Sequence, residues 1–119
     1  MSNIKQDTAS RGSSKDPGSI IYNVTMKVEA TVVNAWLQWM LAEHVPFVMK
    51  TKCFTGYKLV RLLDVDDTEG PTYAIQYYAE SKADYNRYVE LYGSKMNMLS
   101  FEKWGDRLMT FGSVMEIVQ

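Results

Sequence analysis

Ile20 to Val28 reads I-I-Y-N-V-T-M-K-V, and this segment sets the architecture of the whole chain. Most of its residues are β-branched, and its even positions stay apolar while its odd positions become more polar toward Lys27. This alternation is typical of a β-strand that packs one face against a core. We therefore predict the first strand over these residues.

A helix is predicted next, from Thr31 to Lys50, with Thr31 as its N-cap. One apolar stripe recurs along it at four-residue steps, formed by Trp36, Met40, His44 and Val48. Pro46 lacks a backbone N–H and its ring clashes with the preceding turn. We therefore expect the helix to end or kink just after Glu43-His44.

The rest of the chain alternates strands and helices in the same way. We predict a second strand over 55–64, an acidic turn D-V-D-D-T-E-G-P and a third strand over 72–79. A second helix is predicted over 82–92, with Ser81 as its N-cap and Gly93 as its end. A short amphipathic segment over 96–104 then leads into a last strand over 107–117. The order β-α-β-β-α-β is that of the ferredoxin-like fold, an α+β fold. Right-handed crossovers then give a four-stranded antiparallel sheet with both helices on one face.

Both faces of the predicted sheet carry apolar side chains. The last strand places Met109, Phe111 and Met115 opposite Leu108 and Val114. A sheet face in water is normally polar, so something should cover the second face. A symmetric partner is the commonest cover, and two such sheets facing each other would enclose a barrel-like interior. We therefore predict a dimeric α/β barrel, a homodimer formed through the sheet faces.

The N-terminal residues differ from the rest of the chain. Between Lys5 and Ser19, Ala9 is the only apolar side chain. Such a segment cannot bury enough surface to offset its ordering entropy. We expect residues 1–19 to be a disordered leader or a tail added during cloning, and residues 20–119 to form a single domain.

Composition excludes several classes of protein. The chain has 13 Lys and Arg against 14 Asp and Glu, a net charge of −1, which argues against nucleic-acid binding. Its apolar runs are all too short to span a membrane. One cysteine and one histidine supply no zinc cluster, and a lone thiol suits a reducing compartment. We expect a cytoplasmic protein that binds no metal, nucleic acid or membrane.

Five segments together resemble one bacterial family of small proteins, a domain of unknown function within the dimeric α/β-barrel superfamily. They are I-I-Y-N-V-T (20–25), W-L-Q-W-M-L-A-E-H-V-P (36–46), F-T-G (54–56), T-Y-A-I-Q-Y-Y (72–78) and W-G-D-R (104–107). The resemblance spans residues 20–119. It implies the ferredoxin-like fold and the dimer, and it implies no activity.

The superfamily also contains haem-degrading enzymes, which are known for an Asn on the first strand, a Trp near the end of the third and a haem-ligating His on the following helix. Asn23 matches the first position. The third strand ends Tyr77-Tyr78-Ala79 without a Trp, and no histidine follows His44. We therefore expect no haem and no other cofactor.

His44 is the residue on which any predicted chemistry rests. A neutral imidazole near pH 7 is the usual general acid or base, and the apolar stripe turns this imidazole inward. The alternative is that His44 only caps a helix C-terminus, where a cation interacts favourably with the helix dipole.

Four further polar or amphipathic residues lie within apolar strands: Asn23, Arg61, Gln76 and Tyr78. One interpretation is that they point into the barrel and bind an anionic or carbonyl-bearing ligand. The other is structural, with Arg61 on an edge strand and paired with Asp106 or Glu116. The aromatic side chains are expected to form core and interface rather than a stacking platform.

Two functions stay open at this point. The first is a non-catalytic dimer that binds a small molecule or a partner in the barrel cavity. The second is a cofactor-independent monooxygenase or isomerase that uses His44 with Asn23 or Tyr78. They differ in whether His44 and the polar strand residues converge on one cavity.

Overall fold

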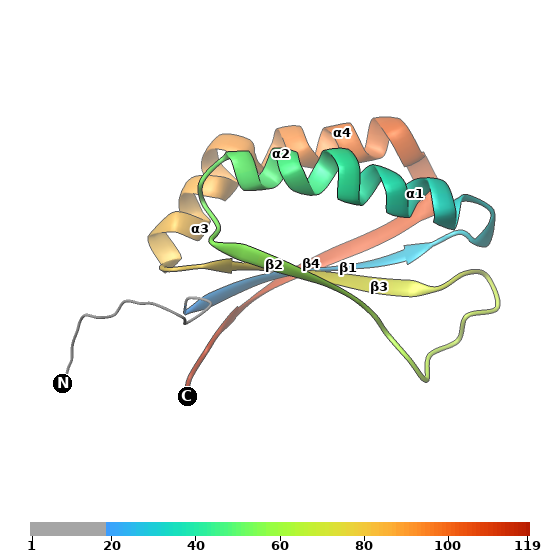
Figure 1. Ribbon diagram of the computed structural model, residues 1–119, viewed down its shortest axis with the longest axis horizontal. Helices are drawn as coiled ribbons and strands as arrows, with labels where there is room; N and C mark the ends of the chain where they lie inside the picture. The colour runs from blue at the N-terminus through green and yellow to red at the C-terminus, as the bar shows by residue number, and fades with distance from the viewer. Residues whose placement is uncertain (1–18) are drawn as a thin grey trace.

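The computed structural model describes residues 19–119, and these form the predicted ferredoxin-like fold. The strands are β1 (Ile20–Val28), β2 (Gly56–Arg61), β3 (Thr72–Ala79) and β4 (Leu108–Glu116). They make one antiparallel sheet in the order β2-β3-β1-β4. Two long helical segments cover one face of this sheet (Figure 1). The bounds of β1 and β3 are as predicted, whereas β2 and β4 are shorter.

The first helical segment runs without a break through η2 (Ala30–Val32), α1 (Val33–Trp39), η3 (Met40–His44) and α2 (Val45–Lys50). The segment does not end after Glu43-His44, which was one of the two predicted outcomes, but continues to Lys50. η3 is a π-helical turn in which the Val45 N–H donates to the Met40 carbonyl. This wider turn places Pro46 in the first turn of α2, where a missing N–H is tolerated. Thr31 is no N-cap either, because its hydroxyl donates instead to the Glu29 carboxylate.

The second helical segment is also continuous, through α3 (Lys82–Tyr88), η4 (Val89–Gly93) and α4 (Ser94–Trp104). Its predicted cap is confirmed, since the Asp84 N–H donates to Ser81 Oγ at 3.2 Å. The predicted end at Gly93 is wrong. Gly93 has helical dihedrals, φ −55° and ψ −48°, and the left-handed residue that ends the segment is Gly105, with φ 58°.

The core lies between the helices and the sheet. Its largest fully buried side chains are Trp36, Met40, Ile75, Val28, Val45, Val48 and Cys53. The predicted assignment of the aromatics to the core is confirmed for Trp36, Trp39, Tyr77, Tyr88 and Trp104, all of them buried. The apolar stripe of the first helix is therefore the face that packs on the sheet.

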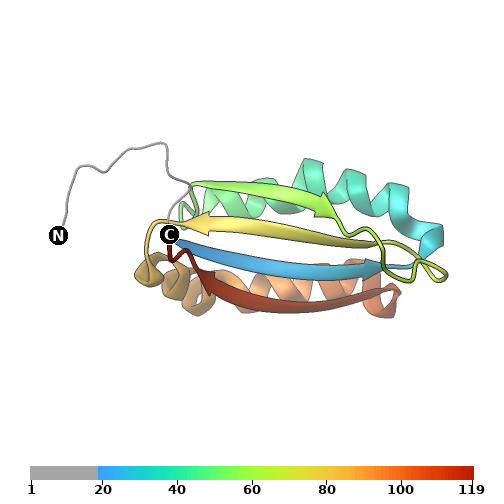
Figure 2. The same cartoon turned by 90° about the horizontal axis from the view of Figure 1, so that it is seen from below.

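No helix of residues 19–119 covers the opposite face of the sheet, as Figure 2 shows from below. Strand alternation places Met109, Phe111 and Met115 on this face. Met109 is 69% exposed and Phe111 67% exposed. The open face, as we call this side of the sheet, therefore carries exposed apolar side chains on β4 in the single chain, in agreement with the sequence.

The acidic turn between β2 and β3 is fastened to the end of β1. The Val28 N–H donates to the Pro71 carbonyl at 3.0 Å. Gly70 adopts φ 148°, and a Cβ built on it would lie 1.9 Å from the Val28 carbonyl oxygen. Only glycine fits this close approach of two backbone segments.

The predicted leader lies outside the described residues except for Ser19. The Ser19 carbonyl accepts a hydrogen bond from the Ile117 N–H at 2.8 Å. Its hydroxyl donates to the Glu80 carbonyl at 2.9 Å. Ser19 therefore belongs to the folded domain, at the junction of β1, β3 and β4.

Candidate functional site

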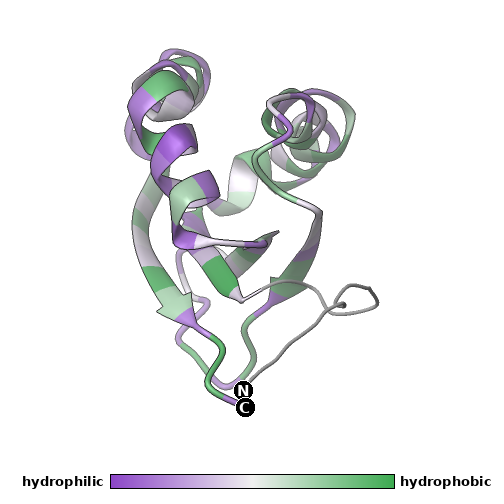
Figure 3. Ribbon diagram, turned by 90° about the vertical axis from the view of Figure 1, so that its left-hand side faces the viewer, coloured by the Kyte–Doolittle hydropathy of each residue, from purple (hydrophilic) through white to green (hydrophobic). Residues whose placement is uncertain are grey.

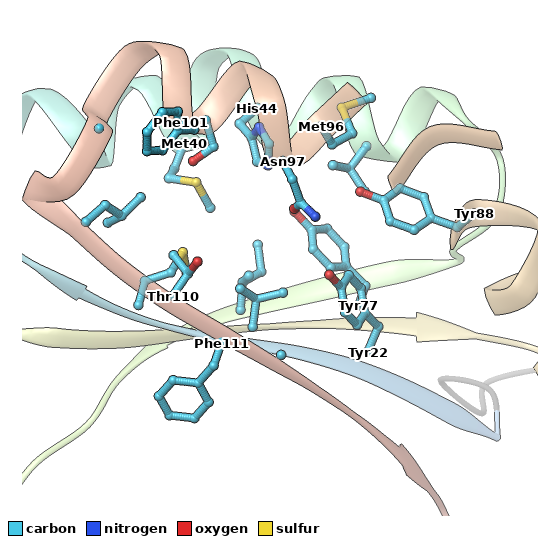
Figure 4. Close-up of a pocket in the computed structure, with 18 residues that line it drawn as sticks. Tyr22, Met40, His44, Tyr77, Tyr88, Met96, Asn97, Phe101, Thr110 and Phe111 are labelled. Carbon is cyan, nitrogen blue, oxygen red and sulfur yellow. The ribbon is translucent and has the colours of Figure 1, made fainter. Parts of the chain in front are cut away.

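A cavity of about 440 Å³ lies between the two helical segments and the sheet. The two segments splay apart above the strands when the molecule is viewed from its end (Figure 3). Side chains from both helical segments and from β1, β3 and β4 line the cavity (Figure 4), among them Tyr22, Val24, Met40, His44, Val48, Ile75, Tyr77, Tyr88, Met96, Asn97, Ser100, Phe101 and Thr110. It therefore lies on the helix side of the sheet.

The cavity has a buried back wall and an exposed mouth. Met40, Ile75 and Tyr77 form the back wall and are each at most 2% exposed. Asn97 on α4 and Thr110 on β4 are exposed. The mouth therefore opens between α4 and β4, and a small molecule could enter without unfolding of the back wall.

One end of the cavity is built from packed aromatic rings. The Tyr22 ring centroid lies 6.2 Å from that of Tyr77 and 5.8 Å from that of Tyr88. Phe54 packs behind them, 5.1 Å from Tyr77 and 5.0 Å from Tyr88. In Figure 4 the tyrosines and Asn97 gather at this end. These mutual contacts hold the tyrosine rings in fixed positions.

His44 lines the cavity from the helix side. The π-helical turn positions it, and its ring stacks on Trp39 with centroids 4.7 Å apart. Nδ1 is buried and bonds to no group within residues 19–119. Burial lowers the pKa of His44 to about 4, so the imidazole is neutral at pH 7. The C-cap interpretation fails, because the helical segment continues to Lys50.

Tyr77 contributes a buried hydroxyl to the cavity wall. The residue is 2% exposed, and its hydroxyl has no hydrogen-bond partner in the part of the chain that the structure describes. Burial is the main cause that raises the pKa of Tyr77, and the same holds for Tyr22 and Tyr88. All three therefore remain protonated, uncharged donors at pH 7.

The cavity walls carry no formal charge at neutral pH. Within residues 19–119, the residues that line it include no Asp, Glu, Lys or Arg. The described residues also contain no group of three or more His, Cys, Asp or Glu side chains placed to hold a metal ion. The chemistry available here is hydrogen bonding by neutral groups and packing against apolar surfaces.

The four predicted strand residues do not join His44 in this cavity. The antiparallel register of β1 with β3 pairs Asn23 with Gln76 and Ile21 with Tyr78. Because these positions alternate with the buried Ile75 and Tyr77, strand geometry places Asn23, Gln76 and Tyr78 on the open face. There the Asn23 amide donates to Thr25 Oγ1 at 3.1 Å.

Arg61 lies at the end of the edge strand β2 and pairs with Asp67 in the acidic turn, at 2.7 Å. Both side chains are exposed, at 50% and 40%. The edge-strand interpretation therefore fits, with Asp67 as the partner in place of Asp106 or Glu116.

Sequence reasoning did not single out the hydroxyl of Tyr77, nor Asn97 and Ser100 on α4. A signal was present for Tyr77, because it is a hydroxyl-bearing residue at a position that alternation assigns to the core. The α4 residues gave no such signal, since they line the cavity only because the second helix continues past Gly93.

No helix among the described residues is both long and apolar enough to cross a membrane.

A search of curated protein sequences found no match to this chain. Among solved structures the chain is similar to a dimeric ferredoxin-like protein from an uncultured marine organism, with 12% identity and a TM-score of 0.60 over 85% of this chain and 96% of that one.

Two other solved structures have the same fold. One is an ethyl tert-butyl ether D (EthD) family protein from Bacillus halodurans, with 11% identity and a TM-score of 0.62 over 83% of this chain and 99% of that one. The other is a variant of SnoaB, a cofactor-independent oxygenase from Streptomyces nogalater, with 13% identity and a TM-score of 0.60 over 86% and 96%. At these identities the likeness shows the fold alone.

The sequence profile of one family matches residues 19–118, which are 100 of the 119 residues. That family is described as a domain of unknown function, in agreement with the resemblance read from the sequence. The chain therefore belongs to the family Domain of unknown function (DUF4286).

Proposed function

We propose that this protein binds a small molecule in the cavity between the helices and the sheet. The observation that carries the proposal is a cavity of about 440 Å³ lined by apolar and aromatic side chains together with several hydrogen-bonding groups. Its volume lies in the range of small-molecule sites, which also combine such groups. The sequence interpretation had placed the ligand inside the barrel, between two sheets. The cavity instead favours a site within each protomer, on the helix side.

We also propose that a second copy of the chain covers the open face. Met109, Phe111 and Met115 would otherwise stay largely in water, and a similar structure is of a dimeric protein. A stable interface of this kind should bury at least about 1,000 Å² in total. In such a dimer Asn23, Gln76 and Tyr78 are interface residues rather than ligand-binding residues.

The alternative function is a cofactor-independent monooxygenase or isomerase that uses His44. Its support is that His44 lines the cavity and that SnoaB, which is similar in fold, is a cofactor-independent oxygenase. A general base works best when its pKa is close to the working pH. With a pKa of about 4, His44 is a weak base at pH 7. The low pKa of His44 therefore favours binding over acid–base catalysis by this residue.

A cavity-filling substitution tests the binding proposal. Val24 lies in the cavity wall on β1 and pairs with Gly112 on β4, so a phenyl ring at position 24 has room to enter the cavity. Naphthalene titrated against the wild type should bind, and Val24→Phe should weaken that binding by at least about 10-fold. Leu59→Phe is the matched control, because Leu59 packs on the same core without lining the cavity.

Two results would contradict the proposal. The first is no binding of naphthalene to the folded wild type. The second is equal binding by the wild type and Val24→Phe, with both proteins showing cooperative thermal unfolding, because the probe would then sit elsewhere. Unfolding transitions of all three proteins establish that each is folded.

A further inference from the structure

We infer that the ligand of this cavity is uncharged, and that a hydrogen-bond acceptor on it is bound by the hydroxyl of Tyr77. The inference rests on the proposed function, since it names the class of molecule that the cavity takes. Its basis is one buried hydroxyl without a protein partner, set in a wall that carries no charge.

The Tyr77 hydroxyl is fixed in place by the sheet. Tyr77 lies on the inner strand β3, between Tyr22 on β1 and Tyr57 on β2. Its ring packs against Tyr22 and Phe54 at centroid distances of 6.2 and 5.1 Å. A donor held in this way loses little freedom when it binds an acceptor.

The same hydroxyl is buried in the cavity wall and has no partner within residues 19–119. Tyr77 lines the cavity and is 2% exposed, and no group among residues 19–119 bonds to its oxygen. Buried polar groups in proteins nearly always have a partner. Figure 4 shows Tyr77 reaching up from the sheet toward the interior of the cavity. An acceptor atom of a bound molecule would satisfy it.

The absence of charge in the walls selects against ions. A carboxylate that entered the cavity would lose its hydration and would meet no Lys or Arg among the residues described as lining it. His44, on the facing wall, is neutral at pH 7 because burial holds its pKa at about 4.

Three probes of similar shape test the inference: naphthalene, quinoline and 1-naphthoate. Quinoline differs from naphthalene by one ring nitrogen, an uncharged acceptor at pH 7, and 1-naphthoate adds a negative charge. For the wild type we expect quinoline to bind about 2- to 10-fold more tightly than naphthalene, the range of one net hydrogen bond. We expect 1-naphthoate to bind at least about 10-fold more weakly than quinoline.

Tyr77→Phe removes only the hydroxyl. In this variant quinoline should lose its advantage, whereas naphthalene should bind as it does to the wild type. Tyr57→Phe is the matched control, because Tyr57 is the neighbour of Tyr77 on β2, is 43% exposed and does not line the cavity. The advantage of quinoline should persist there.

The outcomes separate the two proposals. If naphthalene does not bind to the folded wild type, the proposed function fails. If naphthalene binds but 1-naphthoate binds as tightly as quinoline, the cavity accepts ions and the inference is overturned while the function stands. The inference is also overturned if Tyr77→Phe keeps the full preference for quinoline.

Discussion

Protonation of His44 should destabilise the folded protein. Burial lowers the pKa of its imidazole from 6.5 to about 4 in the folded state, whereas the unfolded chain titrates near 6.5. Between these two values the unfolded chain binds more protons than the folded protein, so acid favours unfolding. The stability that neutral His44 contributes is therefore complete above pH 6.5 and is lost as the pH falls toward about 4.

The size of this effect follows from the two pKa values. Their difference corresponds to at most about 3 kcal/mol, of which about 2 kcal/mol is lost between about pH 7.5 and about pH 5. His44→Phe keeps a ring that can stack on Trp39 and removes the titrating group. The free energy of unfolding should therefore fall by about 2 kcal/mol more in the wild type than in His44→Phe over this range.

Two measurements check this prediction. Chemical denaturation of both proteins at the two pH values gives the difference directly, and the carboxylates, common to both proteins, cancel. His44 is the only histidine of the chain, so the single imidazole resonance in an NMR titration reports its pKa without assignment. A measured pKa of about 6 or above, together with equal acid sensitivity of the two proteins, would refute the burial of this ring beside the cavity.

Three substitutions test other parts of the account. Phe111→Glu puts a charge on the apolar open face and should convert a dimer into a monomer at micromolar concentration, and sedimentation that still shows a dimer would contradict the proposed interface. Tyr77→Phe breaks no protein hydrogen bond in the described chain, so calorimetry should show unchanged stability or a gain of up to about 1–3 kcal/mol. The control Tyr57→Phe should stay within about 0.5 kcal/mol of wild type. A loss above about 1 kcal/mol for Tyr77→Phe would mean that the protein bonds this hydroxyl. Gly70→Ala should lower the free energy of unfolding by at least about 2 kcal/mol, because the new Cβ would lie 1.9 Å from the Val28 carbonyl oxygen. Gly56→Ala, whose Cβ would have no neighbour closer than 3.9 Å, should lower it by less than about 1 kcal/mol. Equal losses of stability in the two variants would rule out the strained turn.

Local patterns were enough to predict the sheet. Period-two alternation in β1 and β3 defined both strands to the residue, because each has one face fixed in the core. The apolar open face was predicted for the same reason, since Met109 and Phe111 alternate with residues that face the helices.

The continuation of both helical segments past their predicted ends was not predictable by the same reasoning. Pro46 and Gly93 are ordinary stop signals, and both were interpreted in that way. In the structure a π-helical turn precedes Pro46 and another includes Gly93. Each π-helical turn contains one residue more than an α-helical turn, and the helix continues beyond it. We attribute this continuation to packing on the sheet, because local helix propensity favours an end at both places.

The site was predictable only in part. His44 was selected because it shares a stripe with Trp36 and Met40, and it does line the cavity. Asn23, Gln76 and Tyr78 were selected because they are polar within apolar strands. Polarity at alternating positions marks a face of the sheet, and it does not tell which face encloses a cavity.

A crystal structure of the protein with quinoline bound tests the central claim most directly. The account predicts one quinoline per protomer between the helices and the sheet, with its nitrogen about 3 Å from the hydroxyl oxygen of Tyr77. Quinoline lying against Phe111 between two facing sheets, with the helix-side cavity unliganded, would contradict it.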